Sequence, residues 1–379
     1  MALQLSRNSR LWVSTVDTGN DSSNTWEFPL MDDFSFSAPV ESTDITIDEA
    51  GPRPTRGSRR FNDAIAPVDW SFSTYIRPYI DNSNHYVIDQ IMWHSLASPV
   101  DIPYDPTNAN TITPEADGTH TIVAGADASG NSAVFGDASG FKVGFNYNSA
   151  HELTELFLFF RVDNKTYKIS GVQVSQAEIS IDISDIGSTS WSGQALTLTQ
   201  MDADPAFMSG VAGTDYTGIV NSAGYLKNKL TTMLLSGDAS GAPKDYNINV
   251  TGCSITINNN VTFLTPTTLG QVDRPIGSFT GTFQVTGSFD AYVNTVTDGS
   301  SDLWKDLSAS LSNTNSFALS FNVGGPKSPV AVINVPTAQL SIPELSVDDL
   351  VSVTTEFMGI PATTDMNDGL EVNLEFRGT

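Results

Sequence analysis

The sequence predicts a mainly β protein with two tandem β-sandwich domains, each with a flanking helix, plus inserted segments. Three observations lead to this prediction. A stretch of alternating apolar and polar residues occurs twice, helical periodicity is confined to short segments, and the turn-forming residues Ser, Thr, Asn, Asp and Gly are abundant. Alternation at period two is typical of half-buried strands.

The repeated stretch covers Leu156–Ile181 (LFLFFRVDNKTYKISGVQVSQAEISI) and Phe317–Ile342 (FALSFNVGGPKSPVAVINVPTAQLSI). The two segments lie 161 positions apart and align without a gap over 26 residues. The identical pairs are Leu158/Leu319, Phe160/Phe321, Val162/Val323, Val174/Val335, Ala177/Ala338, Ser180/Ser341 and Ile181/Ile342. We expect both segments to form a pair of strands around a central turn.

A second match lies upstream of each copy. Ser254–Ile257 (SITI) corresponds to Asp44–Ile47 (DITI), and Thr286–Val293 (TGSFDAYV) corresponds to Asp69–Ile76 (DWSFSTYI). Each half then has the order strand, long loop, strand, helix, strand pair. Two independent matches in the same order indicate a tandem duplication.

The first domain is expected at residues 1–201. Its predicted strands, in order, are Leu11–Val16, Trp26–Leu30, Asp32–Ile47 and Val68–Ile76. Asp48–Asn62 (DEAGPRPTRGSRRFN) interrupts the periodicity and predicts a long loop, which in a compact domain is usually functional. Tyr86–Ala97 predicts an amphipathic helix, with Ile88, Ile91, Met92 and Leu96 on one face and Ser83 or Asn84 as its cap. An insertion at about 99–150 contains short strand candidates at Thr119–Val123 and Phe141–Phe145.

The second domain is expected at residues 246–379, after a joining segment at 202–245. In the joining segment, Leu226, Leu230, Met233 and Leu234 are in helical phase and predict a helix. Asp302–Leu311 predicts the second flanking helix, with Leu303, Trp304, Leu307 and Leu311 on one side and Ser300 or Ser301 as its cap.

Charge and cysteine content exclude several classes of protein. The net charge is −25, from 18 Lys and Arg against 43 Asp and Glu. Such a surface repels nucleic acid, which argues against tight DNA binding but is compatible with facing DNA without adhering to it. Cys253 is the only cysteine, which excludes an intrachain disulfide and a cysteine metal cage. The N-terminal residues lack a signal-peptide pattern and no apolar run reaches membrane-spanning length, so we expect a soluble protein that folds in a reducing cytoplasm.

The sequence contains no convincing catalytic or metal-binding motif. The tetrapeptide DASG, at Asp127, Asp137 and Asp238, is better explained as turn chemistry than as a calcium site. The four histidines, His85, His94, His120 and His151, do not have metal-ligand spacing. The acidic pairs Asp32/Asp33 and Asp348/Asp349 suit turns or caps, and nucleophile-elbow, phosphate-loop and dinucleotide motifs are absent. We therefore expect a protein without enzymatic activity, cofactor or metal.

The predicted loop contains a cluster of positive charge, which is the less abundant sign in this chain. It holds Arg53, Arg56, Arg59 and Arg60. The cluster has three interpretations: a docking arm for an acidic neighbouring subunit, a solvated loop, and a clamp on DNA phosphates. The first is preferred, because in a protein of charge −25 another copy of the same chain is the most available acidic partner.

The run FSFSAPVESTDITIDEAGPRPTRGSRRFNDAIAPVDWSFSTYIRP resembles phage major tail tube proteins, as does AVINVPTAQLSIPELSVDDLVSVTTEFMGIP. The resemblance implies a β-sandwich with a flanking helix and a long loop that contacts the next ring. It also implies that inner sheets join into a barrel around a lumen, and that a duplicated subunit forms three-subunit rings that imitate six. A barrel wide enough for duplex DNA needs roughly two dozen strands, or about four from each of six units.

On this resemblance, the polar positions of the alternating strands are expected to face the lumen. They are Asp69, Ser71, Ser73, Gln176, Glu178, Ser180 and Asp182 in the first copy and Ser288, Asp290, Thr337, Gln339 and Ser341 in the second. The expected inter-ring docking residues are Arg53, Arg56, Arg59, Arg60 and Arg274.

The resemblance implies a virion tail component that is assembled in the host cytoplasm. Its expected partners are copies of itself, the tail terminator, the baseplate or tip, and sheath proteins as a further candidate. Double-stranded DNA passes through without specific binding, and no membrane insertion is expected. Two alternatives stay open: a β-sandwich adhesin or receptor-binding virion protein, and an acidic secreted hydrolase.

Overall fold

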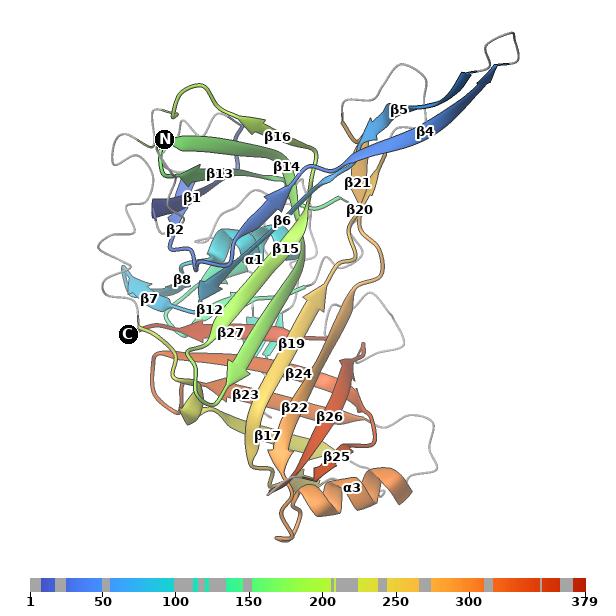
Figure 1. The fold of residues 1–379 in the computed structure, drawn as a ribbon. Helices are drawn as coiled ribbons and strands as arrows, with labels where there is room; N and C mark the ends of the chain where they lie inside the picture. The colour runs from blue at the N-terminus through green and yellow to red at the C-terminus, as the bar shows by residue number, and fades with distance from the viewer. Residues whose placement is uncertain are drawn as a thin grey trace.

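Strands dominate the computed structural model of the chain, which confirms the predicted mainly β class (Figure 1). The structure describes residues 8–17, 25–49, 55–98, 112–114, 120–122, 134–145, 152–205, 208, 224–237, 244–265, 274–309, 316–347, 350–361 and 371–379.

The described part of the first half contains sixteen strands and the helix α1. They are β1 (Ser9–Ser14), β2 (Thr25–Phe28), β3 (Ser35–Ser37), β4 (Val40–Glu49), β5 (Thr55–Ile65), β6 (Val68–Tyr75), β7 (Pro78–Asp81), β8 (Asn84–Val87), α1 (Gln90–Ala97), β9 (Ile112–Pro114), β10 (His120–Ile122), β11 (Val134–Gly136), β12 (Phe141–Val143), β13 (Leu156–Val162), β14 (Lys165–Asp182), β15 (Ser188–Ala195) and β16 (Thr197–Gln200).

The second half follows with the 3₁₀ helix η3, eleven strands and the helix α3. They are η3 (Asn228–Leu230), β17 (Thr232–Gly237), β18 (Lys244–Tyr246), β19 (Val250–Asn258), β20 (Thr262–Leu264), β21 (Gly277–Phe279), β22 (Gln284–Tyr292), α3 (Ser300–Ala309), β23 (Phe317–Val323), β24 (Val330–Leu340), β25 (Glu344–Val347), β26 (Val351–Gly359) and β27 (Asn373–Arg377).

The strand pairing of the first half recurs in the second. The first half pairs β1 with β2 and β13, β14 with β13, β15 and β16, β6 with β15 and β3, and β4 with β5. The second pairs β17 with β18 and β23, β24 with β23, β26 and β27, β22 with β26 and β19, and β20 with β21. The two lists have the same form, as expected of a duplicated unit.

The registers correct the gapless alignment of the repeated stretch. Leu158 lies opposite Ile169, and Leu319 lies opposite Val335. Equivalent residues of the first strand are therefore 161 positions apart, but those of the second strand are 166 apart. The turn explains the difference, because two residues separate the paired Val162 and Lys165 whereas seven separate the paired Val323 and Ala331. The pairs Val174/Val335, Ala177/Ala338, Ser180/Ser341 and Ile181/Ile342 are thus not equivalent.

The register also corrects one of the upstream matches. Ser35 lies opposite Ser71 and Ser254 lies opposite Ser288, with Oγ–Oγ distances of 2.9 Å and 3.2 Å. The counterpart of SITI in β19 is therefore SFS in β3. DITI belongs instead to the β4–β5 hairpin. The match between TGSFDAYV and DWSFSTYI agrees with the pairing, and its Phe72 and Phe289 are both buried.

The two halves share one sheet and one core. The C-terminal part of β14 pairs with β19, from Gln176–Asn258 to Asp182–Gly252. This connection gives a continuous strand order β3-β6-β15-β14-β19-β22-β26-β25, with four strands from each half. A single hydrophobic cluster beneath it contains residues of both halves, such as Phe160 and Phe321. We call this array the joint sheet.

Both predicted flanking helices are present. Helix α1 begins at Gln90 rather than Tyr86, because residues 84–87 form β8, and the residue before it is Asp89 rather than the predicted cap Ser83 or Asn84. Helix α3 spans Ser300–Ala309. In α1, Trp93 packs edge-on against Trp191 of β15, with ring centroids 4.7 Å apart, and contacts Phe376 of β27 at 5.8 Å. The helix therefore packs elements of both halves together. In α3, Leu303 and Leu307 are buried while Trp304 is 45% exposed.

The helix predicted from Leu226, Leu230, Met233 and Leu234 is wrong. The chain forms the short η3 and then the strand β17, which pairs with β23 along its whole length. Tertiary pairing outweighs the helical phase of four apolar residues. Because β17 and β18 correspond to β1 and β2, the pairing favours a start of the second unit before residue 246, the predicted boundary.

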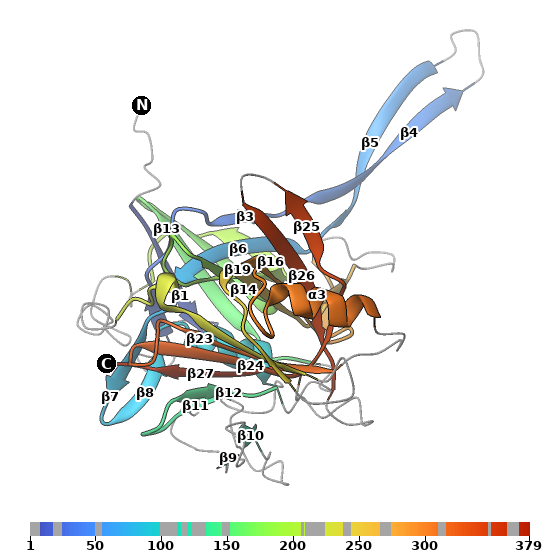
Figure 2. The same cartoon turned by 90° about the horizontal axis from the view of Figure 1, so that it is seen from below.

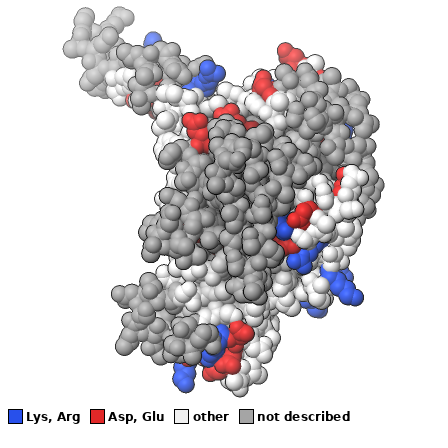
Figure 3. Space-filling model, turned by 180° about the vertical axis from the view of Figure 1, so that it is seen from behind, with Lys and Arg blue, Asp and Glu red and all other residues white. Residues whose placement is uncertain are grey.

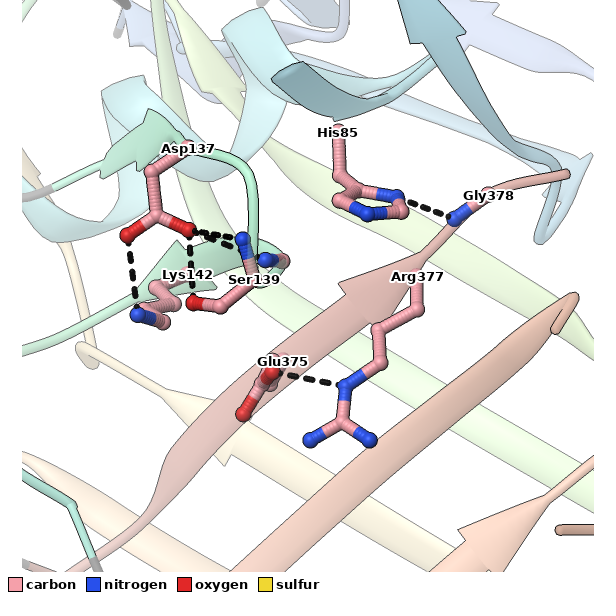
Figure 4. A network of polar contacts seen from close by, with 8 residues as sticks. His85, Asp137, Ser139, Lys142, Glu375, Arg377 and Gly378 are labelled. Carbon is pink, nitrogen blue, oxygen red and sulfur yellow. Dashed lines mark hydrogen bonds and ion pairs between the residues drawn. The ribbon is translucent and has the colours of Figure 1, made fainter. Parts of the chain in front are cut away.

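The insertion of the first half is attached to the last strand of the chain. Strand β12 pairs with β27, and Gly378 donates a backbone hydrogen bond of 2.9 Å to Nδ1 of His85 (Figure 4). Asp137 of the second DASG accepts bonds from the Ser139 and Gly140 amides and the Lys142 ammonium. Burial alone would raise the pKa of Asp137, but these bonds outweigh it and lower the pKa to about 2. The predicted turn role is thus confirmed here, whereas the other two DASG sites lie outside the described residues.

Candidate functional site: the polar face of the joint sheet

The joint sheet has one polar and one buried face, because its strands alternate in phase with one another. Residues directly opposite in paired strands project on the same side of a sheet. One such row crosses seven strands: Ser73, Ser190, Glu178, Thr256, Thr286, Met358 and Gln339. The residues between these positions, such as Ile179 and Ile257, are fully buried in the core. The sequence alternation of each strand therefore produces a single continuous surface.

This polar face carries carboxylates without cations. None of the eight joint-sheet segments, counting β14 from Gln176 onward, contains Lys, Arg or His. The face carries six acidic residues: Asp69, Glu178, Asp182, Asp290, Glu344 and Glu356. Elsewhere on the surface, basic side chains lie close to acidic ones, as the view from behind shows (Figure 3). The missing positive charge is thus a property of this face.

Two shallow hollows lie at equivalent places on the polar face. The first, of about 540 Å³, is lined by Ser35, Ser71 and Gln194 among others. The second, of about 550 Å³, is lined by the equivalent Ser254, Ser288 and Met358 among others. Each lining combines hydroxyl and amide side chains with apolar residues such as Trp70 and Phe357. Each contains one carboxylate, Asp69 or Glu356, so neither has the convergent titratable groups of a catalytic site.

Most of the predicted lumen residues lie on this face. They are Asp69, Ser71, Ser73, Gln176, Glu178, Ser180, Asp182, Ser288, Asp290 and Gln339. Ser341 follows β24 at the edge of the second hollow, where its hydroxyl donates to the Glu356 carbonyl oxygen at 3.2 Å. Ser73 is only 5% exposed because Asp33 and Ser190 cover its hydroxyl.

Thr337 does not join these rows. It lies where the pairing of β24 with β23 shifts register, at a β-bulge between the residues opposite Leu319 and Phe317. The gapless alignment gave Thr337 the place of Gln176, but the structure makes it equivalent to Gly171. Gly171 lies at the matching bulge of β14 with φ +64°.

The sequence prediction also missed part of the polar face. The missed residues are Ser188, Ser190, Ser192 and Gln194 of β15, Ser254, Thr256 and Asn258 of β19, and Thr354 and Glu356 of β26. The signal that could have found them is the same period-two alternation, which is present in STSWSGQA, SITIN and SVTTEFM.

The described part of the predicted arginine loop belongs to the strands of a hairpin, with residues 55–62 in β5, while residues 50–54 lie outside the described residues. Strands β4 and β5 pair from Val40–Ile65 to Glu49–Thr55, and the hairpin projects well beyond the body of the protein (Figures 1 and 2). The loop prediction was wrong because β5 lies outside the core and so lacks an apolar face. We call this hairpin the arm. A shorter hairpin, β20–β21, extends at the same end of the molecule (Figure 1).

The arm separates two of its arginines onto opposite faces. Arg60 forms two hydrogen bonds with the Asp44 carboxylate, at 2.8 Å and 2.9 Å. This contact lowers the pKa of Asp44 and raises that of Arg60. Arg59 lies opposite Ile45, on the same side as Phe61. Ile45 and Phe61 are 48% and 47% exposed, so this side of the arm joins positive charge to accessible apolar surface.

The other predicted docking residues are less fully described. Arg53 lies outside the described residues. Arg56 is placed by its backbone pairing with Asp48, and its side chain is not among those described. Arg274 is exposed in the segment that connects β20 to β21, three residues before β21.

Among the described residues, no three His, Cys, Asp or Glu side chains lie close enough to hold a metal ion. Cys253, next to Asp290, is buried, and this burial raises the pKa of its thiol. None of the helices in the described part of the chain combines the length and apolar character needed to cross a membrane.

The chain matches known proteins over nearly its whole length. A family model described as phage tail tube protein matches residues 16–359. The chain is also 39% identical, over 373 residues, to the tail tube protein pb6 of Escherichia phage T5. That alignment covers 97% of this chain and 75% of the relative. The protein is therefore a structural subunit of the virion tail, and the chain belongs to the phage tail tube protein family.

Proposed function

We propose that three copies of this chain close a ring around a bore, that rings stack into a tube, and that duplex DNA passes through during ejection. The joint sheet forms the wall of the bore, and its polar face lines it. One chain would supply two equivalent wall segments, so three chains would imitate six-fold symmetry.

The observation that carries this proposal is the charge of the polar face. It presents six carboxylates and contains no Lys, Arg or His. DNA binding depends on cations that neutralise phosphates, so a wall without them gives the genome nothing to adhere to. Repulsion from the wall also favours a centred path for the duplex. On this proposal, the predicted lumen residues line the bore, with the exception of Thr337.

The strand count supports closure by three chains. The joint sheet has eight strands, so three copies would give a barrel of about 24. Barrels of 16–18 strands enclose only a water channel, and diameter grows about linearly with strand number. A barrel of this size is therefore wide enough for duplex DNA. Closure would also remove the exposed edges of the sheet.

The two hairpins suit contacts between stacked rings. Both project at one end, and α3 lies at the other, with Trp304 45% exposed. The docking role of Arg53, Arg56, Arg59, Arg60 and Arg274 is refined by the arm geometry. Asp44 already pairs with Arg60, which leaves Arg59, beside Ile45 and Phe61, as the best candidate for contact with an acidic and apolar surface.

Further expected contacts are with the tail terminator, the baseplate or tip, and sheath proteins. We propose no catalytic activity, because neither hollow of the polar face brings titratable groups together and the chain functions as a building block.

Negative-stain microscopy of the purified protein tests this proposal. The expected result is long hollow rods, with three-fold symmetry in end-on views and a bore wider than 20 Å, roughly the width of duplex DNA. Discrete oligomers without a bore would contradict it.

A further inference from the structure

The joint sheet ends in two edge strands that resemble a connection already present inside the chain. At one end β3 pairs with β6, and at the other β25 pairs with β26. Neither edge strand has a second partner among the described strands. The pairing of β14 with β19 inside the chain shows how such edges can meet. In the order of the joint sheet, β14 is the last strand contributed by the first half, and β19 is the first strand contributed by the second.

Strand β25 is the counterpart of the C-terminal part of β14. Phe72 and Phe289 are equivalent, so the residues that follow them, Ser73 and Asp290, are equivalent too. Ser73 lies opposite Ser190, and Asp290 lies opposite Thr354. Those two lie opposite Glu178 and Glu344 in turn. The sequences agree with this assignment, since residues 178–181 read EISI and residues 344–347 read ELSV.

The exposure of the two counterparts differs sharply. Ile179 and Ile181 are 0% and 4% exposed, whereas Leu345 and Val347 are 58% and 70% exposed. The pairing of β14 with β19 places Ile179 opposite Ile255 within the core. Among the described strands, none lies beside β25 in the place that β19 takes beside β14. Two large apolar side chains on an open edge indicate a missing partner.

The missing partner has a counterpart in the chain itself. Strand β3 corresponds to β19, because Ser35 lies opposite Ser71 as Ser254 lies opposite Ser288. Phe36 then corresponds to Ile255, and it packs against Phe160 with ring centroids 5.2 Å apart. An edge with an apolar residue at this position offers Leu345 the contact that Ile255 gives Ile179.

We infer that β25 of one copy pairs antiparallel with β3 of the next, with Glu344 opposite Ser37, Leu345 opposite Phe36, and Ser346 opposite Ser35. The register is carried over from the internal pairs Glu178–Thr256, Ile179–Ile255 and Ser180–Ser254. This inference rests on the proposed ring and identifies the strands, face and register that close it. Because the two edge strands differ, the contact joins one edge of a copy to the other edge of the next copy, which is a head-to-tail contact. Such contacts form a ring when the rotation between copies completes a circle.

Paired cysteines test the register. Ser346→Cys with Ser35→Cys places two thiols at directly opposite positions, about 4.5–5.5 Å apart at Cα and within disulfide range. The control is Ser346→Cys with Ser37→Cys, which uses the same strand and face but is displaced by two residues, out of range for most disulfides. Buried Cys253 provides a low background. Each variant is assembled, checked by microscopy and oxidised with copper-phenanthroline in air.

The expected result on non-reducing gels is conversion of the opposite pair to dimers and trimers, while the displaced pair and each single variant stay monomeric. Absence of rods in the unsubstituted protein would refute the proposed function itself. Rods in which only the displaced pair cross-links would refute the register. Rods of both variants without any cross-link would refute the edge contact and indicate that another surface or another protein covers β25.

Discussion

The hydroxyl of Thr74 donates a hydrogen bond of 3.3 Å to Asp89 and accepts one of 3.1 Å from the indole of Trp191. Asp89 is 1% exposed at the start of α1. Burial raises the pKa of Asp89 to about 7, although its hydrogen bonds oppose the shift. A titratable carboxyl group therefore lies in the core that packs α1 on the joint sheet.

The raised pKa of Asp89 predicts that the stability of the protein depends on pH. Its folded pKa of about 7 lies above the unfolded value of about 3.9, so the folded state holds a proton that the unfolded chain releases. The free energy of unfolding should fall as pH rises from about 4 to about 7, by up to about 4 kcal/mol from this group. Asp89→Asn should remove this component. Urea denaturation at several pH values should show that the free energy of unfolding of the variant rises relative to that of the unsubstituted protein as pH rises. If the two free energies change with pH in parallel, the prediction is contradicted.

Trp93 predicts the strength of the packing between halves. Trp93→Ala removes a fully buried indole between Trp191 and Phe376 and should lower the free energy of unfolding by about 3–5 kcal/mol. The control is Trp304→Ala in α3, where the side chain is 45% exposed and the expected change is within about 0.5 kcal/mol. Equal losses in the two variants, measured by urea denaturation, would show that Trp93 does not join the halves as described.

The sequence predicts best where a strand has one buried face. Strands β6, β14 and β22 alternate because one side packs on the core, so their polar residues could be assigned to a common face. The register between copies could not be found in this way. Alternation alone would reveal a five-residue shift, because an odd shift exchanges the two faces of a strand. The register shifts of β14 after Ile169 and after Val174 each move the alternation by one residue, so many apolar matches survive. Thr337 was misassigned for this reason.

Strand β5 of the arm and strand β17 were missed for a different physical reason. Both strands of the arm lie away from the core, so β5 can carry Arg, Ser and Asn without an apolar period, and its backbone pairing carries no sequence signal. In β17, TMLLSG places apolar residues in helical phase, but the chain pairs them with β23. The pairing partner is more than eighty residues away, and local sequence does not encode it.

Substitution of the arginines of the arm is predicted to weaken the stacking of rings without affecting folding. Replacing Arg53, Arg56, Arg59 and Arg60 with Ser should leave a folded monomer with an unchanged melting temperature, because the arm lies outside the core. Rods should be fewer and shorter by microscopy and sedimentation. Arg10→Ser is the control, because Arg10 pairs with Glu27 away from the arm, at 2.6 Å and 2.7 Å. Rods of normal length from the four-arginine variant would refute the docking role.

The polar face predicts that added cations turn a conduit into a DNA-binding surface. Glu178→Lys with Asp290→Lys should leave assembly intact but cause tubes to retain duplex DNA at low salt, with retention falling steeply as salt rises. Asp81→Lys, on an exposed residue of β7, is the control for charge alone. Cosedimentation of labelled DNA with tubes gives the measurement. If the two variants retain the same amount of DNA, the polar face does not line the bore.

A charge placed on the exposed edge strand β25 is predicted to prevent assembly without affecting folding. Leu345→Lys places a charge where the counterpart Ile179 is fully buried, and an unpaired ammonium group in such a contact costs several kcal/mol. Because Leu345 is 58% exposed in the single chain, the monomer should unfold at the same urea concentration as the unsubstituted protein. The lowest concentration that gives rods should rise at least tenfold, since about 1.4 kcal/mol suffices for each factor of ten. The control is Leu234→Lys in β17, where the leucine is 52% exposed outside the joint sheet, and this variant should assemble normally. Rods of Leu345→Lys at the usual concentration would show that this edge stays open in the tube.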